Sequence, residues 1–261
     1  MKRIVSIINH KGGVGKTTSA VNIGAGLHQL GKKILLVDMD PQANLTINFG
    51  IDPQEQEKTI YTALAGKCSL PIIRKDNAPD IVPANLDLSV AEIELNNEPG
   101  RESILKSLLL SICSDYDYVL IDCPPSLGFL TLNALSASHS AIIPVELSTF
   151  SLVGMTRLFD VIKKVSNRIN PELQDYNILV VRTDKRQSVQ RELSVYLGEK
   201  YATHMIPVEI RQSVKILESQ VRQTDIFSYA PNSRTAIDYM NVCEFLLQIT
   251  RQTSLLWQNQ K

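Results

Sequence analysis

The stretch His10–Thr18, which reads HKGGVGKTT, decides the fold because it joins a short apolar run to a helical pattern. Its three glycines let successive backbone N–H groups turn inward and form a cradle for an anion. The helix that follows points its positive end at the same place. Lys16 can then reach the β- and γ-phosphates of a nucleotide, Thr17 can give its hydroxyl to Mg²⁺, and Thr18 can bond the α-phosphate. The stretch therefore predicts a phosphate-binding loop.

The loop departs from the strict pattern G-x-x-x-x-G-K-[ST], which would need glycine where His10 stands. It fits instead a deviant form, K-G-G-x-G-K-T, with an additional lysine at Lys11. The alternative is a tight glycine turn with incidental lysines. The position between a strand and a helix favours the phosphate loop, because the chemistry requires that context.

Short apolar runs alternate with helical patterns on both sides of the loop. The expected strands are Arg3–Asn9, Lys33–Asp38, Asp117–Asp122, Ser140–Val145 and Asn177–Val181, and the clearest helices are Lys16–Leu30, Glu102–Cys113 and Leu152–Val165. Each run is apolar on both faces, as parallel strands covered by helices must be. The alternation predicts an α/β fold: a doubly wound, mostly parallel sheet flanked by helices. We expect a single domain over residues 1–261, with the irregular stretch Asp52–Asn97 as an elaboration at the sheet edge.

The composition is that of an ordinary globular protein. The 261 residues carry 27 basic and 27 acidic side chains, which argues against a polybasic protein but not against a local basic patch. The four cysteines, at 68, 113, 123 and 243, form no C-x-x-C pair, so we expect reduced thiols and no zinc or iron–sulfur site. The amino end lacks a signal-peptide layout and no apolar stretch reaches about 20 residues, so we expect a cytoplasmic protein without a membrane span.

Carboxylates follow two of the expected strands. Leu35–Asn44 reads LLVDMDPQAN and places Asp38 and Asp40 at the carboxyl end of a strand, where ligands bind in open α/β sheets. Val119–Ser126 reads VLIDCPPS, an apolar strand that ends in Asp122, which we expect to hold Mg²⁺ through a water. The alternatives are a turn or helix-cap aspartate at Asp40 and an ordinary strand-terminal aspartate at Asp122.

The deviant loop, DPQAN and DCPPS occur in an order and spacing that resemble the ParA family of partitioning ATPases, in the superfamily that includes MinD and the nitrogenase iron protein. The two aspartate segments have the forms usual in ParA, and the resemblance runs from Met1 to about Ile249. It implies that Lys11 reaches across a dimer to the partner's ATP, as an arginine finger does. It also implies that Asp40 positions the attacking water and that Asp38 lies near the metal.

The residues and the resemblance together define the expected site. Ile206–Arg211 (IPVEIR) resembles the family segment that lies against the adenine, which adds Pro207. The expected nucleotide contacts are Lys11, Gly12, Gly13, Val14, Gly15, Lys16, Thr17, Thr18 and Pro207. The expected catalytic residues are Lys11, Lys16 and Asp40, and the expected metal residues are Thr17, Asp38 and Asp122.

Arg186, Arg211 and Arg234 match family positions that carry arginines used for DNA, and the alternative for each is a solvated surface charge. Few residues precede the phosphate loop, so an N-terminal helix-turn-helix and operator binding are not expected. Any DNA contact should then be to the phosphate backbone, which carries no base information. The sequence also departs from the family: His10 stands where glutamine is common, and Gln212–Lys215 stands where LSEA is common.

The expected function is that of an Mg-ATP-dependent, dimerising ATPase that hydrolyses ATP slowly and uses ATP and Mg²⁺ as cofactors. Its ATP-bound homodimer is expected to bind nonspecific double-stranded DNA on the nucleoid, and a ParB-like protein to stimulate hydrolysis and release. The cargo stays open between a chromosome, a plasmid and a protein cluster.

A MinD-like membrane-positioning ATPase is the main alternative, and a basic amphipathic C-terminal helix would be its signature. The last segment, Phe245–Lys261, has apolar residues at Leu255–Trp257, but its only cations are Arg251 and Lys261. That pattern favours a core-packing helix with a frayed tail. A non-enzymatic regulator with the same fold is the third hypothesis, and the complete set of catalytic and metal residues argues against it.

Overall fold

The computed structural model describes residues 3–95 and 97–258, except the side chains of 149–153 and 251–258. Its centre is a seven-stranded sheet with the order β3-β2-β4-β1-β5-β6-β7, in which all neighbouring strands are parallel. The strands are β1 (Arg3–Ile7), β2 (Ile34–Asp38), β3 (Asp80–Val82), β4 (Tyr118–Asp122), β5 (Ser140–Glu146), β6 (Asp175–Thr183) and β7 (Ile210–Arg211). β1, β2, β4, β5 and β6 are the five strands expected from the sequence, so the predicted fold class is confirmed.

The sequence analysis does not predict the two edge strands. β3 has three residues and β7 has two, too few for the two-residue period of a strand to show in a sequence. β3 lies inside the irregular stretch 52–97 and at one edge of the sheet, which confirms the expected elaboration there. An antiparallel bridge between Ile73 and Ile81 extends this edge.

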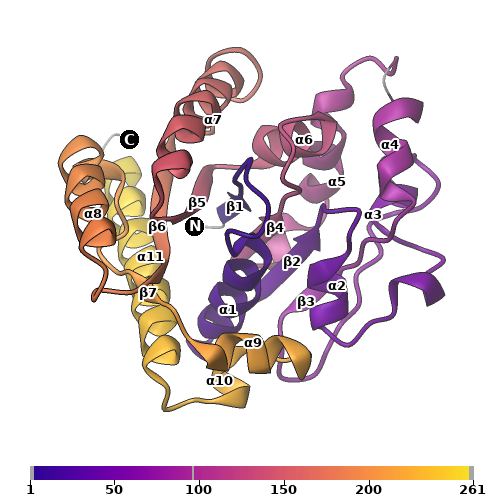
Figure 1. The fold of residues 1–261 in the computed structure, drawn as a ribbon. Coiled ribbons are helices and arrows are strands. Elements are labelled where there is room, and N and C mark those ends of the chain that lie inside the picture. The colour runs from indigo at the N-terminus through magenta and orange to yellow at the C-terminus, as the bar shows by residue number, and fades with distance from the viewer. Residues whose placement is uncertain (1–2, 96, 259–261) are drawn as a thin grey trace.

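Helices cover both faces of the sheet (Figure 1). They are α1 (Lys16–Gln29), α2 (Asn44–Asn48), α3 (Ile60–Leu64), α4 (Leu88–Glu94), α5 (Ile104–Leu110), α6 (Phe129–Ala137), α7 (Thr149–Arg168), α8 (Ser188–Lys200), α9 (Val214–Val221), α10 (Ile226–Tyr229) and α11 (Arg234–Gln258). Short 3₁₀ turns occupy Pro53–Glu55, Arg101–Ser103, Cys113–Asp115 and Ala202–His204. α5 is shorter than the helix expected over 102–113, because 3₁₀ turns occupy both ends of that stretch.

Two clusters of buried apolar side chains, one on each face, show the doubly wound arrangement. On one face α5, α6 and α7 pack on the sheet through side chains such as Leu109, Leu130 and Leu158. On the other face α1, α10 and α11 pack through side chains such as Leu27 and Phe227. Successive residues of β2 alternate between the two clusters, as a strand buried on both faces requires.

The C-terminal helix α11 packs on the core through its described part, where Cys243 and Leu246 are buried. This confirms the core-packing prediction as far as residue 250. The side chains of Arg251 and Leu255–Trp257, and residue Lys261, lie outside the described residues. Among the helices of the described chain, none combines the length and the apolar character that crossing a bilayer requires.

The strand register brings the carboxyl ends of the central strands together. Ile7 of β1 and Asp38 of β2 both pair with Asp122 of β4. The segments that follow these strands, 8–15, 39–43 and 123–128, therefore meet at one edge of the sheet. In open α/β folds ligands bind at this edge.

Candidate nucleotide-binding site

The phosphate-binding loop is shaped by its glycines and by a buried asparagine. Gly13 and Gly15 have φ angles of 72° and 84°, a left-handed conformation that side chains disfavour, and Gly15 immediately precedes α1. Asn9 donates through Nδ2 to the carbonyl of Pro144 in β5 (2.7 Å), and its Oδ1 accepts from the backbone N–H of Lys11 (3.0 Å). Asn9 thus fixes the start of the loop to β5, and the loop ends at the positive N-terminus of α1, where an anion is favoured.

The side chain of Lys16 reaches back from the start of α1 to the beginning of this loop. This side chain is buried, and Nζ donates to the backbone carbonyl of Lys11 at 3.3 Å. Burial lowers the pKa of the ammonium, and the carboxylates of Asp122 and Asp40 act in the opposite direction. A neutral carbonyl at this distance compensates a buried ammonium poorly, so the position suits an anionic phosphate.

The carboxylate of Asp122 is fully buried, and neither oxygen receives a well-formed hydrogen bond from the described residues. Burial raises its pKa well above the usual range and the charge of Asp38 adds to this, whereas the Thr17 hydroxyl and Lys16 act against it. A buried carboxylate without partners is costly, and a hard divalent cation is the group that satisfies it. Thr17 and Asp122 therefore fit Mg²⁺. In the described part of the chain no group of three or more His, Cys, Asp or Glu side chains forms a metal cage, and Mg²⁺ needs none because phosphates and waters supply most of its ligands.

Asp38 lies beside Asp122 but already has its own partners. It is fully buried, and its carboxylate accepts from the backbone N–H of Thr46 (2.9 Å), the Thr46 hydroxyl (2.7 Å) and the backbone N–H of Asp40 (3.2 Å). The Thr46 hydroxyl in turn accepts from the N–H of Ala84 (3.0 Å). Burial raises the pKa of Asp38 to about 6, and these hydrogen bonds oppose the rise. Asp38 thus fastens segment 40–46 to the sheet, and its place near the metal stays a prediction.

Asp40 begins that segment with its carboxylate oriented by a tight turn. Oδ1 accepts from the backbone N–H of Gln42 (2.9 Å), and its carbonyl accepts from the N–H of Ala43 (2.9 Å), which has a left-handed φ of 53°. The turn interpretation of Asp40 is therefore correct for its local geometry. The negative charge of Asp40 also raises the pKa of Lys16, against the effect of burial. Its role in positioning water stays a prediction.

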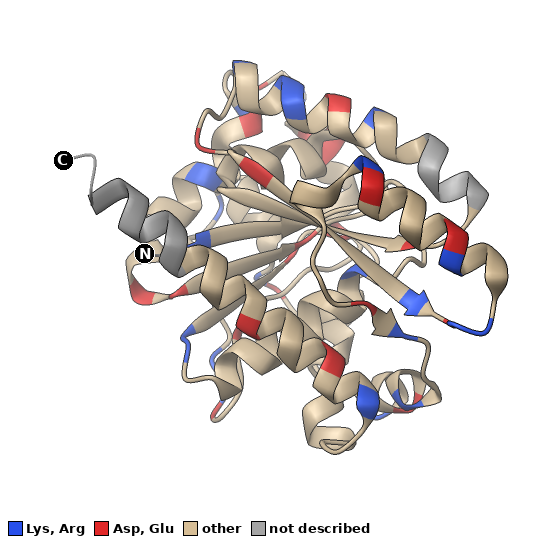
Figure 2. Cartoon of the chain, turned by 90° about the vertical axis from the view of Figure 1, so that its left-hand side faces the viewer, with Lys and Arg blue, Asp and Glu red and all other residues tan. Residues whose placement is uncertain are grey.

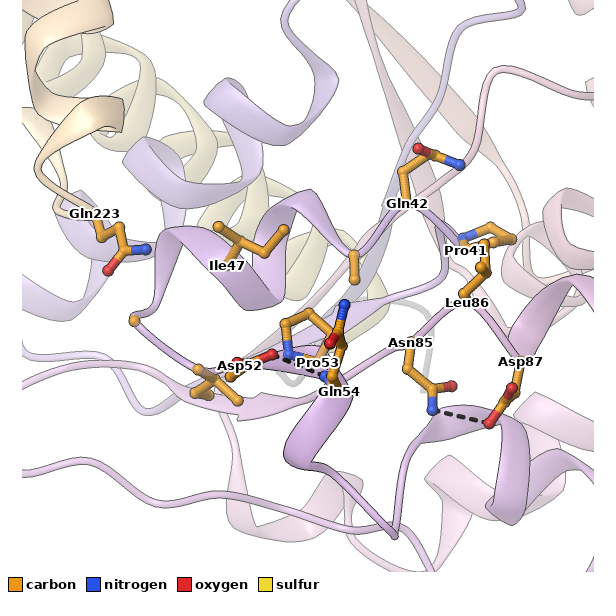
Figure 3. A pocket seen from close by; sticks show the side chains of 13 residues that line it. Pro41, Gln42, Ile47, Asp52, Pro53, Gln54, Asn85, Leu86, Asp87 and Gln223 are labelled. Atoms are coloured by element: carbon orange, nitrogen blue, oxygen red, sulfur yellow. Dashed lines mark hydrogen bonds between the residues drawn. The ribbon is translucent and has the colours of Figure 1, made fainter.

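A cleft of about 680 Å³ opens beside Asp40 at the carboxyl ends of β2 and β3 (Figure 3). Its walls come from segments 41–54 and 85–87 and from Gln223, which follows α9. Its two acids are locally bonded: Asp52 accepts from the N–H of Gln54 (2.9 Å), and Asp87 accepts from the side-chain amide of Asn85 (3.1 Å). The cleft begins directly after Asp40 in the chain, and none of the predicted nucleotide residues lines it.

His10, the departure from the family loop, connects the loop to α7. Its imidazole lies so close to Gly154 that a Cβ at that position would overlap the ring. Nδ1 is buried and has no hydrogen-bond partner among the described residues. Burial lowers the pKa of His10, and the positive charges of Lys16, Arg157 and Lys11 lower it further. The imidazole is therefore neutral at pH 7, and α7 packs against the loop through it.

The structure does not bring the remaining predicted residues to the phosphate loop. Pro207 is exposed on the segment that enters β7, three positions from β1 in the sheet. Arg186 is exposed and bonds the carboxylate of Asp184 through Nε and Nη2 (both 2.9 Å). Arg211 makes a similar two-point contact with Asp238 of α11, at 2.7 and 2.8 Å.

Arg234 is exposed at the first position of α11. The neighbouring surface is electrically mixed, because α7, α8 and α11 each carry both basic and acidic residues (Figure 2). The acidic partners Asp184 and Asp238 were not anticipated in the sequence. The adenine and DNA assignments of these residues stay predictions.

Two supporting residues also escaped the sequence analysis. Asn9 carried a weak signal, as a polar residue that ends an apolar run. Thr46 carried none, because its contacts join β2 to the segment after β3.

The family model described as an AAA domain matches residues 2–175. The chromosome-partitioning ATPase Soj of Treponema pallidum (strain Nichols) is 39% identical over 246 residues, which cover 92% of this chain and 94% of that protein. The sporulation initiation inhibitor protein Soj of Bacillus subtilis (strain 168) is 38% identical over 251 residues, which cover 94% of this chain and 98% of that protein.

A solved structure agrees over the whole sheet. Cobyrinic acid a,c-diamide synthase from Mycobacterium smegmatis, with bound ADP and magnesium, matches with a TM-score of 0.84 at 33% identity, over 96% of each chain. The same protein is also known with an ATP analogue and magnesium. The fold, the phosphate loop with its carboxylates, and the relatives agree: this chain belongs to the AAA-domain family and, within it, to the ParA/Soj group of partitioning ATPases.

Proposed function

We propose that this protein binds Mg-ATP at the loop 10–18, dimerises around it and hydrolyses it slowly to partition DNA. The observation that carries the proposal is the fully buried carboxylate of Asp122, which has no well-formed hydrogen bond from the described residues and only Thr17 and Lys16 to offset its charge. A phosphate would give the buried Lys16 an anionic partner, and a divalent cation would do the same for the carboxylate of Asp122. Relatives solved with ADP or an ATP analogue and magnesium support the choice of ligand.

The roles of the residues follow from their places. The loop N–H groups and Lys16 hold the β- and γ-phosphates, and Thr18 bonds the α-phosphate. Mg²⁺, when bound, neutralises phosphate charge, with Thr17 as a direct ligand and Asp122 acting through a water. Asp40, oriented by its turn, accepts a hydrogen bond from the attacking water and aligns it with the γ-phosphate. Lys11 extends from the rim of the loop to the γ-phosphate in a second subunit.

This arrangement makes the γ-phosphate a switch between monomer and dimer. A ligand shifts such an equilibrium only by its differential affinity, and a change from 1:99 to 99:1 needs about 5.5 kcal/mol. Lys11 supplies part of that difference, because it meets the γ-phosphate only in the dimer. ADP lacks this phosphate, so it leaves the dimer unsupported.

The proposed partner of the ATP-bound dimer is nonspecific double-stranded DNA, and a ParB-like protein stimulates hydrolysis. From Arg182 to Arg251 the sequence has ten basic and eight acidic residues, an excess too small for tight binding by a monomer. A dimer presents two such surfaces to one duplex, which raises avidity without new contacts. The relative named for chromosome partitioning supports this cargo class. A dimer that holds DNA in this way would lie on the nucleoid in the cytoplasm. The synthase name of the solved structure carries less weight, because its identity to this chain is lower than that of the partitioning relatives.

The test is a salt titration of DNA binding by fluorescence anisotropy, on two duplexes of unrelated sequence, with ATP and with ADP. We expect DNA binding in the presence of ATP but not of ADP, with equal affinity for both duplexes. Each phosphate contact should contribute about −0.9 to the slope of log K against log salt. Lys16→Ala is the control that separates nucleotide dependence from simple charge. Equal binding with ATP and ADP, or a strong preference for one duplex, contradicts the proposal.

A further inference from the structure

A distant segment of the chain is hydrogen-bonded to the helix that carries the phosphate-binding residues. Gln220, on α9, donates from Nε2 to the hydroxyl oxygen of Thr18 at 2.8 Å, across 202 residues of sequence. The backbone N–H of Ile226 donates to Oδ1 of Asn22 on α1 (2.8 Å), and Asn22 donates from Nδ2 to the carbonyl of Thr18 (2.7 Å). Segment 220–226 is thus fastened to the first two turns of α1.

The side chain of Gln220 is held by its surroundings. α9 is capped by Ser213, whose hydroxyl accepts from the N–H of Lys215 (3.2 Å). Glu218 bonds both Lys215 (2.8 Å) and Tyr229 (2.9 Å), which joins α9 to α10. Ser219 is buried and Gln220 half-buried, so the amide is confined to the side facing α1.

The direction of the hydrogen bond has a chemical consequence. A threonine hydroxyl has one proton to donate and two lone pairs that accept. Inside a helix such a hydroxyl ordinarily gives its proton to the backbone carbonyl four residues earlier. Because Gln220 donates to the oxygen of Thr18, the proton of Thr18 points away from Gln220. Among the described residues this hydroxyl donates no hydrogen bond, to the i−4 carbonyl or to any other acceptor, so its proton remains available to a ligand oxygen.

We propose that Gln220 is a positioning residue that aims the hydroxyl proton of Thr18 at the α-phosphate and polarises that hydroxyl as a donor. The inference rests on the proposed function, because it needs Thr18 to contact the nucleotide. The α-phosphate is common to ATP and ADP, so Gln220 strengthens both complexes equally. Gln220 therefore contributes to the affinity for either nucleotide, whereas Lys11 distinguishes ATP from ADP.

The test is a double-mutant cycle on nucleotide affinity, measured by calorimetry with Mg-ATP and Mg-ADP. Gln220→Ala is expected to weaken both nucleotides by roughly 3–10-fold, the effect of one neutral hydrogen bond. Thr18→Val is expected to weaken both by at least as much. The double variant should be no weaker than Thr18→Val alone, because the two side chains act as one unit.

Gln220→Glu separates orientation from packing. A carboxylate only accepts, so it captures the Thr18 proton and places a negative charge near the α-phosphate. We expect it to bind nucleotide more weakly than Gln220→Ala, although glutamate keeps the size of glutamine. If the side chain merely fills space, Gln220→Met, which keeps the size without the donor or a charge, should bind nucleotide as the parent does. Gln29→Ala, an exposed glutamine at the far end of α1, is the matched control and should leave affinity unchanged.

The outcomes distinguish the inference from the function on which it rests. If Thr18→Val leaves both affinities unchanged, the phosphate role of Thr18 is wrong and the inference fails with it. If Thr18→Val weakens binding but Gln220→Ala adds its own independent loss in the double variant, the inference alone is wrong. Thermal unfolding of each nucleotide-free variant verifies that it folds as the parent does.

Discussion

The phosphate-loop edge of the sheet and the surface that carries the predicted DNA arginines hold their charges in opposite ways. At the loop, Lys16 and Asp122 are both buried. Lys16 has a single carbonyl partner at 3.3 Å, and Asp122 has no well-formed hydrogen bond from the described residues. On the other surface, Arg186 is 90% exposed and already bonded to Asp184, and Arg211 is bonded to Asp238.

The difference shows how far each region depends on a ligand. A buried charge with incomplete partners costs several kcal/mol until a ligand completes it, so the ligand is integral to the site. An exposed ion pair such as that of Arg186 with Asp184 contributes about 0–1 kcal/mol and exchanges its carboxylate for a DNA phosphate at little cost. The pair of Arg211 with Asp238 differs, because the carboxylate of Asp238 is buried and would be left without the guanidinium. Substitutions at the loop should therefore nearly abolish nucleotide binding or hydrolysis. Substitutions on the arginine surface should change DNA affinity only slightly.

Lys16→Ala should produce the largest effect. We expect ATP affinity to fall by at least about 100-fold, because charge-assisted hydrogen bonds contribute about 1.5–3 kcal/mol each and Lys16 serves two phosphates. A titration with a fluorescent nucleotide measures it. Lys11→Ala is the control in the same loop: it should bind ATP as a monomer but fail to dimerise in sedimentation. An ATP-dependent dimer of Lys11→Ala would show that the lysine does not act across subunits.

Asp40→Ala should come next, with an effect on turnover alone. We expect normal Mg-ATP binding and dimerisation with hydrolysis slower by roughly 10²–10⁴, the usual cost of losing a positioned acid–base group. Phosphate release with DNA present measures the rate. Loss of ATP binding would show that Asp40 acts mainly by forming the turn with Gln42. Unchanged hydrolysis would show that Asp40 is not a catalytic residue.

The arginine surface should respond more weakly. Arg186→Ala and Arg211→Ala are each expected to flatten the slope of log K against log salt by about 1 and to weaken unrelated duplexes alike. Asp184→Asn should have the opposite effect, because it frees Arg186 from its internal partner. The salt titration described above measures all three. An unchanged slope in Arg186→Ala would place the DNA contact elsewhere, and ATP-dependent dimerisation of this variant is the control.

The smallest effect concerns acid stability. Burial and three nearby cations lower the pKa of His10, so below its ordinary value near 6.5 the unfolded chain takes up a proton before the folded one does. Stability from this group is therefore complete above about pH 6.5 and falls as the pH drops below it. His10→Gln should reduce the loss of Tm between pH 7.5 and 5.5 by no more than about 2 °C, since the ring is partly solvated.

Thermal melts of both proteins at the two pH values provide the measurement. His139, whose pKa burial also lowers, remains in both proteins and contributes equally to the acid sensitivity of each. Identical pH dependence of the two melts would show that His10 is not held neutral by the fold.

The sequence by itself determined the class of fold and the chemistry of the loop. The glycines, the lysines and the threonines of the loop lie within nine consecutive residues, so local backbone geometry alone brings them together. Five strands are visible as apolar runs bounded by turns. Asp38 and Asp122 were placed at strand ends for the same local reason, and their register in a parallel sheet then brings them together.

Tertiary structure alone decided which of these groups lack partners. Asp38 and Asp122 have the same sequence context, an apolar strand ending in aspartate. Thr46 nevertheless gives Asp38 two short hydrogen bonds, whereas Asp122 receives no well-formed one from the described residues. The contacts of Arg211 with Asp238, of His10 with Gly154 and of Gln220 with Thr18 likewise join residues far apart in the chain. A local pattern cannot specify such pairs, because they depend on how the helices pack over the sheet, and this packing determines whether a charge is satisfied, exposed or available to a ligand.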